Sequence, residues 1–129
     1  MRQHKILLVD DSNTILMMEK FILAKCGFEL VTASNGEEAL LKAQQHKPDL
    51  VLMDVIMPKM NGFEACQALR AIEATKDTPI IMVTTRGEAA NVEAGWLSGC
   101  NDYVTKPINA VELLAKVRNL LGDPVKAGV

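Results

Sequence analysis

The sequence predicts an α/β fold in which a five-stranded parallel sheet carries helices on both of its faces. Short apolar runs alternate with segments of helical spacing through most of the 129 residues, and this alternation is typical of βαβ units. The runs ILLV at 6–9 and LVLM at 50–53 contain no polar residue, as expected for strands that helices cover on both sides. A chain of this length corresponds to about one domain.

The predicted strands are short runs of aliphatic and β-branched residues that end in turn-forming residues. In chain order they are 5–9, 28–32, 49–53, 79–84 and the weaker run 102–105. Because helical segments separate them, consecutive strands are expected to run parallel and to be joined by right-handed crossovers.

Helices are predicted between the strands from apolar residues at helical spacing. The first covers about 13–26, ahead of Gly27, which stands where a left-handed residue usually follows a helix. Its expected inward face is Ile15, Met18, Ile22 and Cys26. The second covers about 36–45 behind the cap candidates Ser34 and Asn35. Its expected inward residues are Ala39, Leu40 and Ala43.

The second half of the chain contributes three further predicted helices. One starts near Asn61, and its expected inward face is Phe63, Cys66, Leu69 and Ile72. The next covers 88–98 and stops at Gly99. The last covers 109–121 with Asn109 as its N-cap. Its expected inward face is Val111, Leu114, Val117 and Leu121. Residues 123–129 are expected to form a tail or the start of a linker.

Composition and charge favour a cytoplasmic globular domain. The net charge is −2, which does not indicate a general nucleic-acid footprint. No apolar run approaches the roughly 20 residues that a membrane helix needs. The N-terminal stretch MRQHKILLVDD is too short in its apolar part for a signal peptide. The cysteines show no CxxC spacing and are interpreted as free thiols.

Polar side chains follow the predicted strands at the point where each strand ends. In chain order they are Asp10 and Asp11, Asp54, Thr84 and Thr85, and Lys106 and Pro107. Parallel strands end at one edge of a sheet, so these groups are expected to converge there.

Three carboxylates at one edge repel each other unless a cation lies among them. Oxygen ligands without histidine or thiolate favour Mg²⁺, which often shares a phosphate with the protein. Asp54 is then either a metal ligand only or also a nucleophile that accepts a phosphoryl group. A plain structural interpretation exists for each residue, because Asp10 and Asp11 fit a helix cap and Lys106 fits a turn before Pro107. Their joint occurrence at several strand ends favours the chemical interpretation.

These segments resemble the receiver domain of bacterial two-component response regulators, and single-domain regulators of the chemotaxis type are the closest in size. The resemblance covers about residues 5–122 and is carried by ILLVDDS (6–12), LVLMDVIMPKMNGFE (50–64), IIMVTT (80–85) and DYVTKPI (102–108). It implies a flavodoxin-like (βα)5 fold with strand order 2-1-3-4-5. It also implies a phosphorylation-activated switch for intracellular signalling, rather than an enzyme that acts on other substrates.

The resemblance implies a role for each residue of the strand-end group. Asp54 matches the phosphoacceptor, which receives a phosphoryl group from the phosphohistidine of a sensor histidine kinase or phosphotransfer protein. Asp10, Asp11, Asp54 and the backbone carbonyl of Ile56 match the ligands of Mg²⁺, with Mn²⁺ as an alternative. Lys106 matches the lysine that contacts the phosphoryl group.

The remaining matches concern switching. Thr84 matches the switch hydroxyl, Tyr103 the aromatic residue whose burial changes on activation, and Pro107 the residue usually preceded by a cis bond. Activation would shift the face made by the fourth helix, the fifth strand and the fifth helix toward a form that binds a downstream protein. Ile56 and Arg86 occupy positions that modulate dephosphorylation in the family, and the apolar Ile56 side chain predicts slow autodephosphorylation.

Other classes of function fit less well. A Mg²⁺-dependent phosphatase with an aspartyl nucleophile usually carries an Asp-x-Asp pattern, whereas this sequence reads Asp54-Val55-Ile56. A nucleotide-binding fold needs a phosphate-binding loop, and neither GxxxxGK[ST] nor GxGxxG occurs. A pure scaffold gives no reason for the acids, the hydroxyl and the lysine to occur together.

The sequence is compatible with two domain organisations that occur in this family. Residues 1–129 are expected to be a single receiver domain that works by protein contacts, as a monomer or a weak phosphorylation-dependent dimer. The alternative is a receiver cut from a longer protein with a DNA-binding or enzymatic output domain. No DNA-binding motif is visible after residue 122, so we expect the chain itself to bind neither nucleic acid nor membranes.

Overall fold

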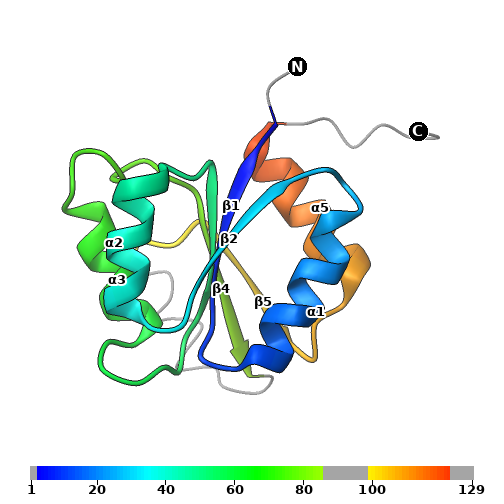
Figure 1. Cartoon of the computed structure of the whole chain (residues 1–129), viewed down its shortest axis with the longest axis horizontal. Coiled ribbons are helices and arrows are strands. Elements are labelled where there is room, and N and C mark those ends of the chain that lie inside the picture. The colour runs from blue at the N-terminus through cyan, green and yellow to red at the C-terminus, as the bar shows by residue number, and fades with distance from the viewer. Residues whose placement is uncertain (1–2, 86–98, 123–129) are drawn as a thin grey trace.

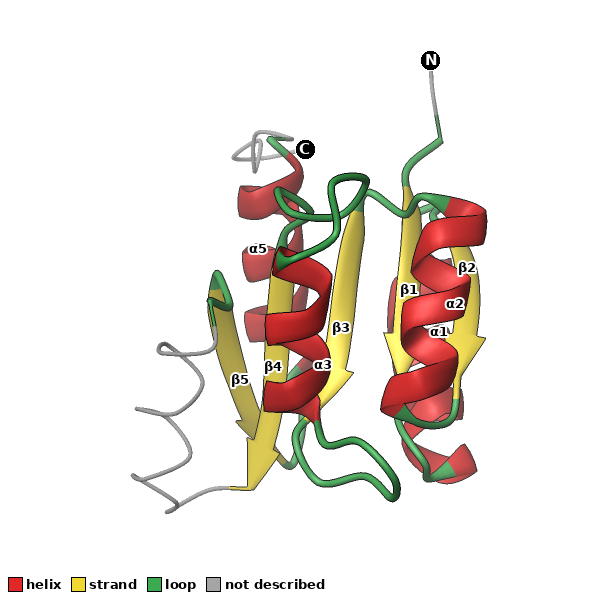
Figure 2. Cartoon of the chain, turned by 90° about the vertical axis from the view of Figure 1, so that its left-hand side faces the viewer, coloured by secondary structure: helices red, strands yellow, loops and turns green. Residues whose placement is uncertain are grey.

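A computed structural model describes residues 3–85 and 99–122 of the chain (Figures 1 and 2). The strands are β1 (Lys5–Val9), β2 (Glu29–Ala33), β3 (Leu50–Asp54), β4 (Ile80–Thr85) and β5 (Asp102–Lys106). The helices are α1 (Asn13–Ala24), α2 (Gly36–His46), α3 (Gly62–Arg70) and α5 (Ala110–Leu121). The helix predicted at 88–98 and the tail predicted at 123–129 lie outside the described residues.

The strands form one parallel sheet in the order β2-β1-β3-β4-β5, as predicted. Helices α2 and α3 cover one face of the sheet, and α1 and α5 cover the other (Figure 1). The strands all point the same way, so their carboxyl ends lie along one edge (Figure 2). The arrangement is flavodoxin-like, and folds of this kind bind ligands outside the carboxyl ends of their strands.

Apolar side chains of the sheet fill two cores, because successive residues of a strand point to opposite faces. The core under α2 and α3 includes Leu7, Val9, Val51, Met53, Ile80 and Met82. The core under α1 and α5 includes Ile6, Leu8, Leu50, Leu52, Ile81 and Val83. The central strand β3 is buried along its whole length, so the residue at its end is held by rigid, fully packed backbone.

The predicted strands are confirmed to within one residue at each end. The predicted caps of α2 and α5 are confirmed as well. Asn35 accepts a hydrogen bond from the Glu38 backbone N–H at 2.8 Å, and Asn109 accepts one from the Glu112 backbone N–H at 3.0 Å. Helix α1 ends at Ala24, two residues before the predicted end. The backbone N–H groups of Cys26 and Gly27 bond to carbonyls three residues earlier, instead of four as in an α-helix.

The predicted inward face of α1 is only partly right: Ile22 packs against the core, but Met18 does not. The buried residues of this helix are Leu16, Glu19 and Leu23, whereas Met18 is 41% exposed. Met18 follows Leu16 by two positions, which places it about 200° around the helix from Leu16. Apolar residues surround most of α1, so their spacing alone did not show which stripe meets the sheet.

Two smaller corrections concern α5 and α3. Leu113 and Val117 form the buried stripe of α5, and Val111 is 79% exposed because it lies on the opposite side from Leu113. Helix α3 buries Cys66 and Leu69 as predicted but ends at Arg70, so the predicted helical position Ile72 lies beyond it.

Within the described part of the chain, no helix has both the length and the apolar character needed to span a membrane.

Candidate functional site

The carboxyl edge of the sheet gathers the polar residues that the sequence singled out. Asp10 directly follows β1, Asp54 is the last residue of β3, and Lys106 is the last residue of β5. Thr84 lies one residue before the end of β4 and pairs in register with Thr105. These residues, far apart in the chain, meet because parallel strands end together.

Strand alternation places the charged members of this group on the α1 and α5 side of the sheet. Asp10 and Asp54 continue the positions of Leu8 and Leu52, which belong to the core on that side. The Asp10 backbone N–H also bonds to the Ala33 carbonyl of β2 at 3.1 Å, so the sheet fixes its backbone. Thr84 follows Met82 by two residues on β4, so its side chain lies on the opposite face of the sheet, the one that α2 and α3 cover.

Carboxyl oxygens of Asp10, Asp11 and Asp54 lie within 4.8 Å of one another, and we call this group the acidic pocket. Asp10 and Asp54 are buried, while Asp11 is exposed at the rim. The ammonium of Lys106 lies 3.0 Å from Oδ1 of Asp54 and 3.5 Å from Oδ2 of Asp10. Among residues 3–85 and 99–122, one ammonium thus faces three carboxyl groups, so acidic groups outnumber basic ones in this part of the pocket.

Burial and crowding shift the pKa values of these groups. Burial raises the pKa of Asp54 to about 6, the Asp10 carboxylate adds to the rise, and the hydrogen bond from Lys106 opposes it. Burial also raises the pKa of Asp10, against the hydrogen bond from the Ser12 backbone. Burial by itself would lower the pKa of Lys106, but the hydrogen bond and charge of Asp54 raise it overall.

The chemistry of these donors fits a hard divalent cation such as Mg²⁺. Carboxylate oxygens are the ligands that Mg²⁺ prefers, and it usually takes only a few of them from the protein. Oδ1 of Asp10 accepts a hydrogen bond from the Ser12 backbone N–H at 2.8 Å, whereas its buried Oδ2 makes none within residues 3–85 and 99–122. A cation at this position would satisfy that oxygen and reduce the repulsion among the acids.

The remaining predicted residues lie on β4, on β5 and in the loops that follow β3 and β5. Thr84 is buried, and its hydroxyl makes no hydrogen bond in the described part of the chain. Tyr103 is half-buried against the core under α3, and its backbone carbonyl accepts a hydrogen bond from Lys116 at 2.6 Å. The Lys106–Pro107 peptide bond is cis. The side chain of Ile56 is 63% exposed on the loop that follows Asp54.

The loop after Asp54 is anchored at both ends. The Val55 N–H bonds to the Val83 carbonyl at 3.1 Å, and the Gly62 N–H bonds back to the Val55 carbonyl at 2.8 Å. Asn61 and Glu64 close the start of α3 with a reciprocal pair of side-chain to backbone hydrogen bonds, at 2.9 and 3.0 Å. These bonds hold the backbone around Asp54 in one conformation.

One acid near the pocket was missed by the reasoning from sequence. Glu19 of α1 is buried, and its burial, reinforced by the charge of Asp10, raises its pKa to about 9. The signal was present in the sequence, because Glu19 stands three residues after Leu16 and four before Leu23. The predicted inward face did not include Leu16, Glu19 or Leu23, so the acid was overlooked.

Comparison with known proteins gives a consistent result. A family model described as the response regulator receiver domain matches residues 6–118. The alkaline phosphatase synthesis transcriptional regulatory protein PhoP of Bacillus subtilis is 41% identical over 117 residues, which are 91% of this chain and 48% of that protein. The chain therefore spans about half the length of the curated relatives it matches.

Two solved structures share the whole fold. The chemotaxis protein CheY4 of Vibrio cholerae has a TM-score of 0.86 at 38% identity, over 92% of this chain and 99% of that one. The receiver domain of the sensor histidine kinase PA1611 from Pseudomonas aeruginosa has a TM-score of 0.87 at 28% identity, over 94% of this chain and 99% of that one. The latter structure contains a magnesium ion coordinated in its active-site cleft.

Proposed function

The chain belongs to the family of response regulator receiver domains, and on this premise we propose that Asp54 is its phosphoacceptor. The phosphoryl donor would be a phosphohistidine on a sensor histidine kinase or a phosphotransfer protein. The observation that carries this proposal is the position of Asp54, at the end of the buried central strand with the Lys106 ammonium 3.0 Å away. No other acid of the pocket combines rigid backbone with such close contact to a cation.

The reaction is a transfer of one phosphoryl group between two side chains. A carboxylate oxygen of Asp54 attacks phosphorus, the bond from phosphorus to the histidine nitrogen breaks, and the imidazole leaves with the electron pair of that bond. Lys106 neutralises charge on the phosphoryl oxygens. Mg²⁺, held by Asp10, Asp11, Asp54 and the carbonyl of Ile56, would supply further charge neutralisation when bound, and Mn²⁺ would serve as a substitute.

The change to the partner-binding conformation would follow from the negative charge that the phosphoryl group adds at Asp54. The Thr84 hydroxyl is buried and has no hydrogen-bond partner in the described part of the chain, so it is available to donate to the phosphoryl group. Movement of Thr84 would then allow Tyr103 to change its burial. We propose that β5, α5 and the predicted helix at 88–98 form the face that binds a downstream protein in the phosphorylated state.

This protein is a regulator, and we propose that it catalyses only its own phosphoryl transfer and a slow autodephosphorylation. Ile56 supports the slow rate, because an exposed apolar side chain beside Asp54 cannot hold an attacking water. Arg86, the second of the two positions that modulate dephosphorylation in the family, lies outside the described residues. A measured half-life of seconds for the phosphorylated form, without a phosphatase, would contradict this part of the proposal.

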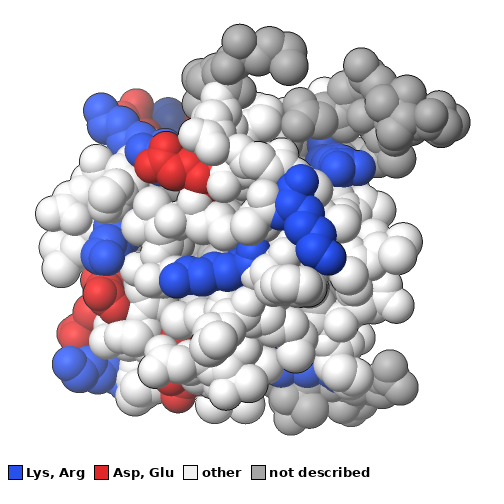
Figure 3. Space-filling model, turned by 45° about the vertical axis from the view of Figure 1, so that its right-hand side comes forward, with Lys and Arg blue, Asp and Glu red and all other residues white. Residues whose placement is uncertain are grey.

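The proposed partners are proteins, and the proposed setting is the cytoplasm. On the face that Figure 3 shows, uncharged side chains cover most of the surface, and basic and acidic side chains lie among them. We propose that residues 1–129 form one receiver domain, as a monomer or a weak phosphorylation-dependent dimer. The curated relatives are about twice as long, so any output domain and its target are part of the proposal and not of the described structure.

The intact mass of the chain after incubation with acetyl phosphate and Mg²⁺ tests this function. We expect a gain of one phosphoryl group, about 80 Da, which is lost in Asp54→Asn and in the presence of EDTA. Asp102→Asn is the matched control, since Asp102 lies at the opposite end of β5 from Lys106, and it should still be labelled. Labelling of the Asp54→Asn variant, or none in the unmodified chain, would refute the assignment of Asp54.

A further inference from the structure

Glu19 is a buried acid that the proposed phosphorylation chemistry does not use. It lies on the inward face of α1 between Leu16 and Leu23, and only 1% of it is exposed. Its Oε1 is buried and makes no hydrogen bond to any other described residue. A buried polar group without a partner is costly, because it loses its hydration without compensation. Core packing by itself would favour a leucine here, so it does not explain the acid.

The carboxyl group of Glu19 lies on the side of the sheet that carries the acidic pocket. Leu16 and Leu23, which flank Glu19 on the helix, share a core with Leu8 of β1. Asp10 follows Leu8 by two residues, so its side chain points to this same face. Asp10 is also the charged residue with the largest effect on the pKa of Glu19, ahead of Lys106 and Asp54. Glu19 therefore lies on the face of the sheet that carries the acidic pocket, within electrostatic reach of Asp10.

Asp10 has an unused hydrogen-bonding position on the same side. Its Oδ1 accepts from the Ser12 backbone, while its buried Oδ2 has only the Lys106 ammonium at 3.5 Å among the described groups. That ammonium lies closer to Asp54, and under the proposed function it turns to the phosphoryl group. The Asp10 carboxylate then needs another group to hold its orientation.

We propose that Glu19 is a positioning residue for Asp10, whose polar head holds the Asp10 carboxylate in the orientation of a Mg²⁺ ligand. The contact would run across one buried water, which would donate one hydrogen to the Glu19 carboxyl oxygen and the other to the lone pair of Oδ2 that a bound cation leaves free. Polar groups behind a metal ligand commonly fix its orientation in this way. An apolar side chain of similar size would fill the core but leave Asp10 free to turn. This inference rests on the proposed function.

The test measures Mg²⁺ affinity by titration calorimetry on the full chain, alongside stability by urea unfolding. Glu19→Leu removes the polar head, Glu19→Gln keeps it, and Leu23→Met is a matched control one turn further along the same face. We expect Glu19→Leu to bind Mg²⁺ about tenfold to a hundredfold more weakly, with a stability equal to or above that of the unmodified chain. Glu19→Gln and Leu23→Met should bind Mg²⁺ as the unmodified chain does. Glu19→Met replaces the leucine variant if that one does not fold.

Equal Mg²⁺ affinity in Glu19→Leu and the unmodified chain would overturn the proposal and make Glu19 a core residue only. An affinity of Glu19→Gln as low as that of Glu19→Leu would overturn it too, because the polar head would then not be sufficient. Failure of the proposed function looks different. In that case the unmodified chain would not bind Mg²⁺, or Asp10→Asn would bind it unchanged.

Discussion

At the residue scale, Gly62 is a position where the backbone dictates the amino acid. Its N–H bonds to the Val55 carbonyl at 2.8 Å, which brings the start of α3 close under the end of β3. A Cβ atom at this position would collide with the backbone carbonyl oxygen of Asp54 and contact Cε of Met82. Only glycine allows this approach, so Gly62 helps to place Asp54 although it carries no side chain.

We therefore expect Gly62→Ala to destabilise the protein by about 1–3 kcal/mol and to slow phosphorylation of Asp54. The reason is that relief of the collision must move the carbonyl of Asp54 itself. Urea unfolding and the rate of labelling by acetyl phosphate measure the two effects. Gly27→Ala is the control: a Cβ there meets nothing within 4 Å, so it carries only the penalty for its φ of 78°. Equal labelling rates in the two variants would contradict the role given to Gly62.

Lys106 opposes the rise in the pKa of Asp54 that burial and Asp10 cause. The pKa of Asp54 is raised to about 6 by burial and by Asp10, in spite of the ammonium 3.0 Å away. An ammonium favours the anionic carboxylate, so its removal in Lys106→Met should raise the pKa of Asp54 further above its ordinary value. A pH titration of the carboxyl carbon by NMR, without divalent metal, measures this value. Lys116→Met should leave it unchanged, since Lys116 pairs with Asp102 and Glu112. A fall in the pKa of Asp54 in Lys106→Met would show that the ammonium does not act on it as described.

At the scale of elements, Arg70 connects the end of α3 to the segments that precede β4 and β5. Its guanidinium donates to the Gly99 carbonyl at 2.9 Å, to the Thr78 carbonyl at 2.7 Å and to Oδ1 of Asn101 at 2.7 Å. The same Asn101 oxygen accepts from the Ile80 backbone N–H at 2.8 Å. One planar side chain therefore joins α3, the start of β4 and the segment that enters β5.

Arg70→Lys should destabilise the protein by about 1.5–3 kcal/mol, because a lysine ammonium cannot reach several acceptors with the fixed fork of a guanidinium. Urea unfolding measures the loss. Lys76→Met is the control, since Lys76 forms a surface pair with Glu73 at 3.2 Å that is worth at most about 1 kcal/mol. If Arg70→Lys loses no more stability than Lys76→Met, then water satisfies the acceptors of the guanidinium equally well, and the prediction is wrong.

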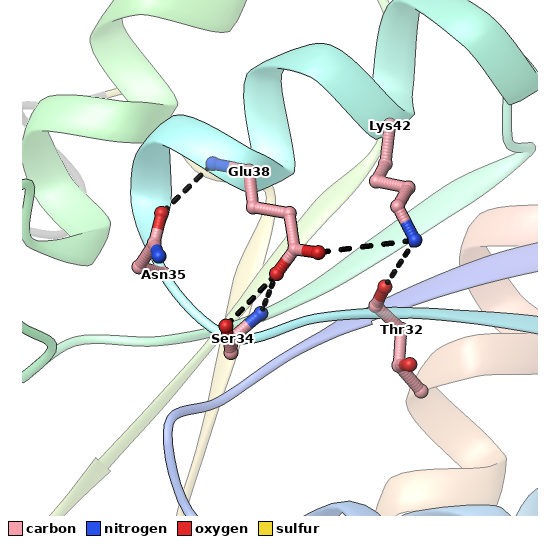
Figure 4. Close-up of polar contacts among 5 residues, drawn as sticks. All are labelled: Thr32, Ser34, Asn35, Glu38 and Lys42. Atoms are coloured by element: carbon pink, nitrogen blue, oxygen red, sulfur yellow. Dashed lines mark hydrogen bonds and ion pairs between the residues drawn. The ribbon is translucent and has the colours of Figure 1, made fainter.

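The start of α2 carries a polar network (Figure 4). Oε1 of Glu38 accepts from the Ser34 backbone N–H at 2.6 Å and from its hydroxyl at 2.9 Å. Lys42 lies 3.9 Å from Oε2 of Glu38 and donates to the Thr32 carbonyl at 3.2 Å. The backbone hydrogen bond from Ser34 and the one from its hydroxyl lower the pKa of Glu38 below its ordinary value.

A lowered pKa gives this network a definite pH dependence. The ionised Glu38 stabilises the fold above its unfolded pKa of about 4.5, and this contribution is lost as pH falls through the lower folded value. Glu38→Gln should therefore cost less than about 1 kcal/mol at neutral pH and flatten the fall in stability below pH 4.5. Urea unfolding across this range measures it, with Glu37→Gln as control because Glu37 pairs only loosely with Lys59, at 3.9 Å. Identical curves for Glu38→Gln and the unmodified chain would contradict the prediction.

At the scale of the whole molecule, stability should fall from the centre of the sheet to its edges. All of β3 is buried between β1 and β4, whereas β2 and β5 are edge strands of the described sheet with partly exposed residues. We expect the amides of β3 to exchange hydrogen only on global unfolding, and those of β2 and β5 to exchange by local opening as well. Hydrogen exchange with mass spectrometry measures this order. Protection of β2 equal to that of β3 would contradict it.

Much of this architecture was predictable from the amino-acid sequence. Alternation of apolar runs with helical segments predicted a parallel sheet, and parallel strands must end at one edge. That rule placed Asp10, Asp54 and Lys106 together before any contact was known, because their distance depends on topology and not on side-chain detail. The strand ends therefore predicted a polar edge, and the strand order implied by the family resemblance made Asp10 and Asp54 neighbours.

The tertiary structure decided what the local pattern left ambiguous. Helix α1 is apolar on most of its surface, so only packing against the sheet selected Leu16, Glu19 and Leu23 as its buried stripe. That packing buries Glu19, which the helical pattern alone would leave as an ordinary surface acid. The polar residues at the strand ends follow from the sequence, since apolar runs and turn residues are local patterns, whereas the order of the strands in the sheet is tertiary. The burial and pKa of each group depend on every neighbour at once, and those neighbours meet only in the folded molecule.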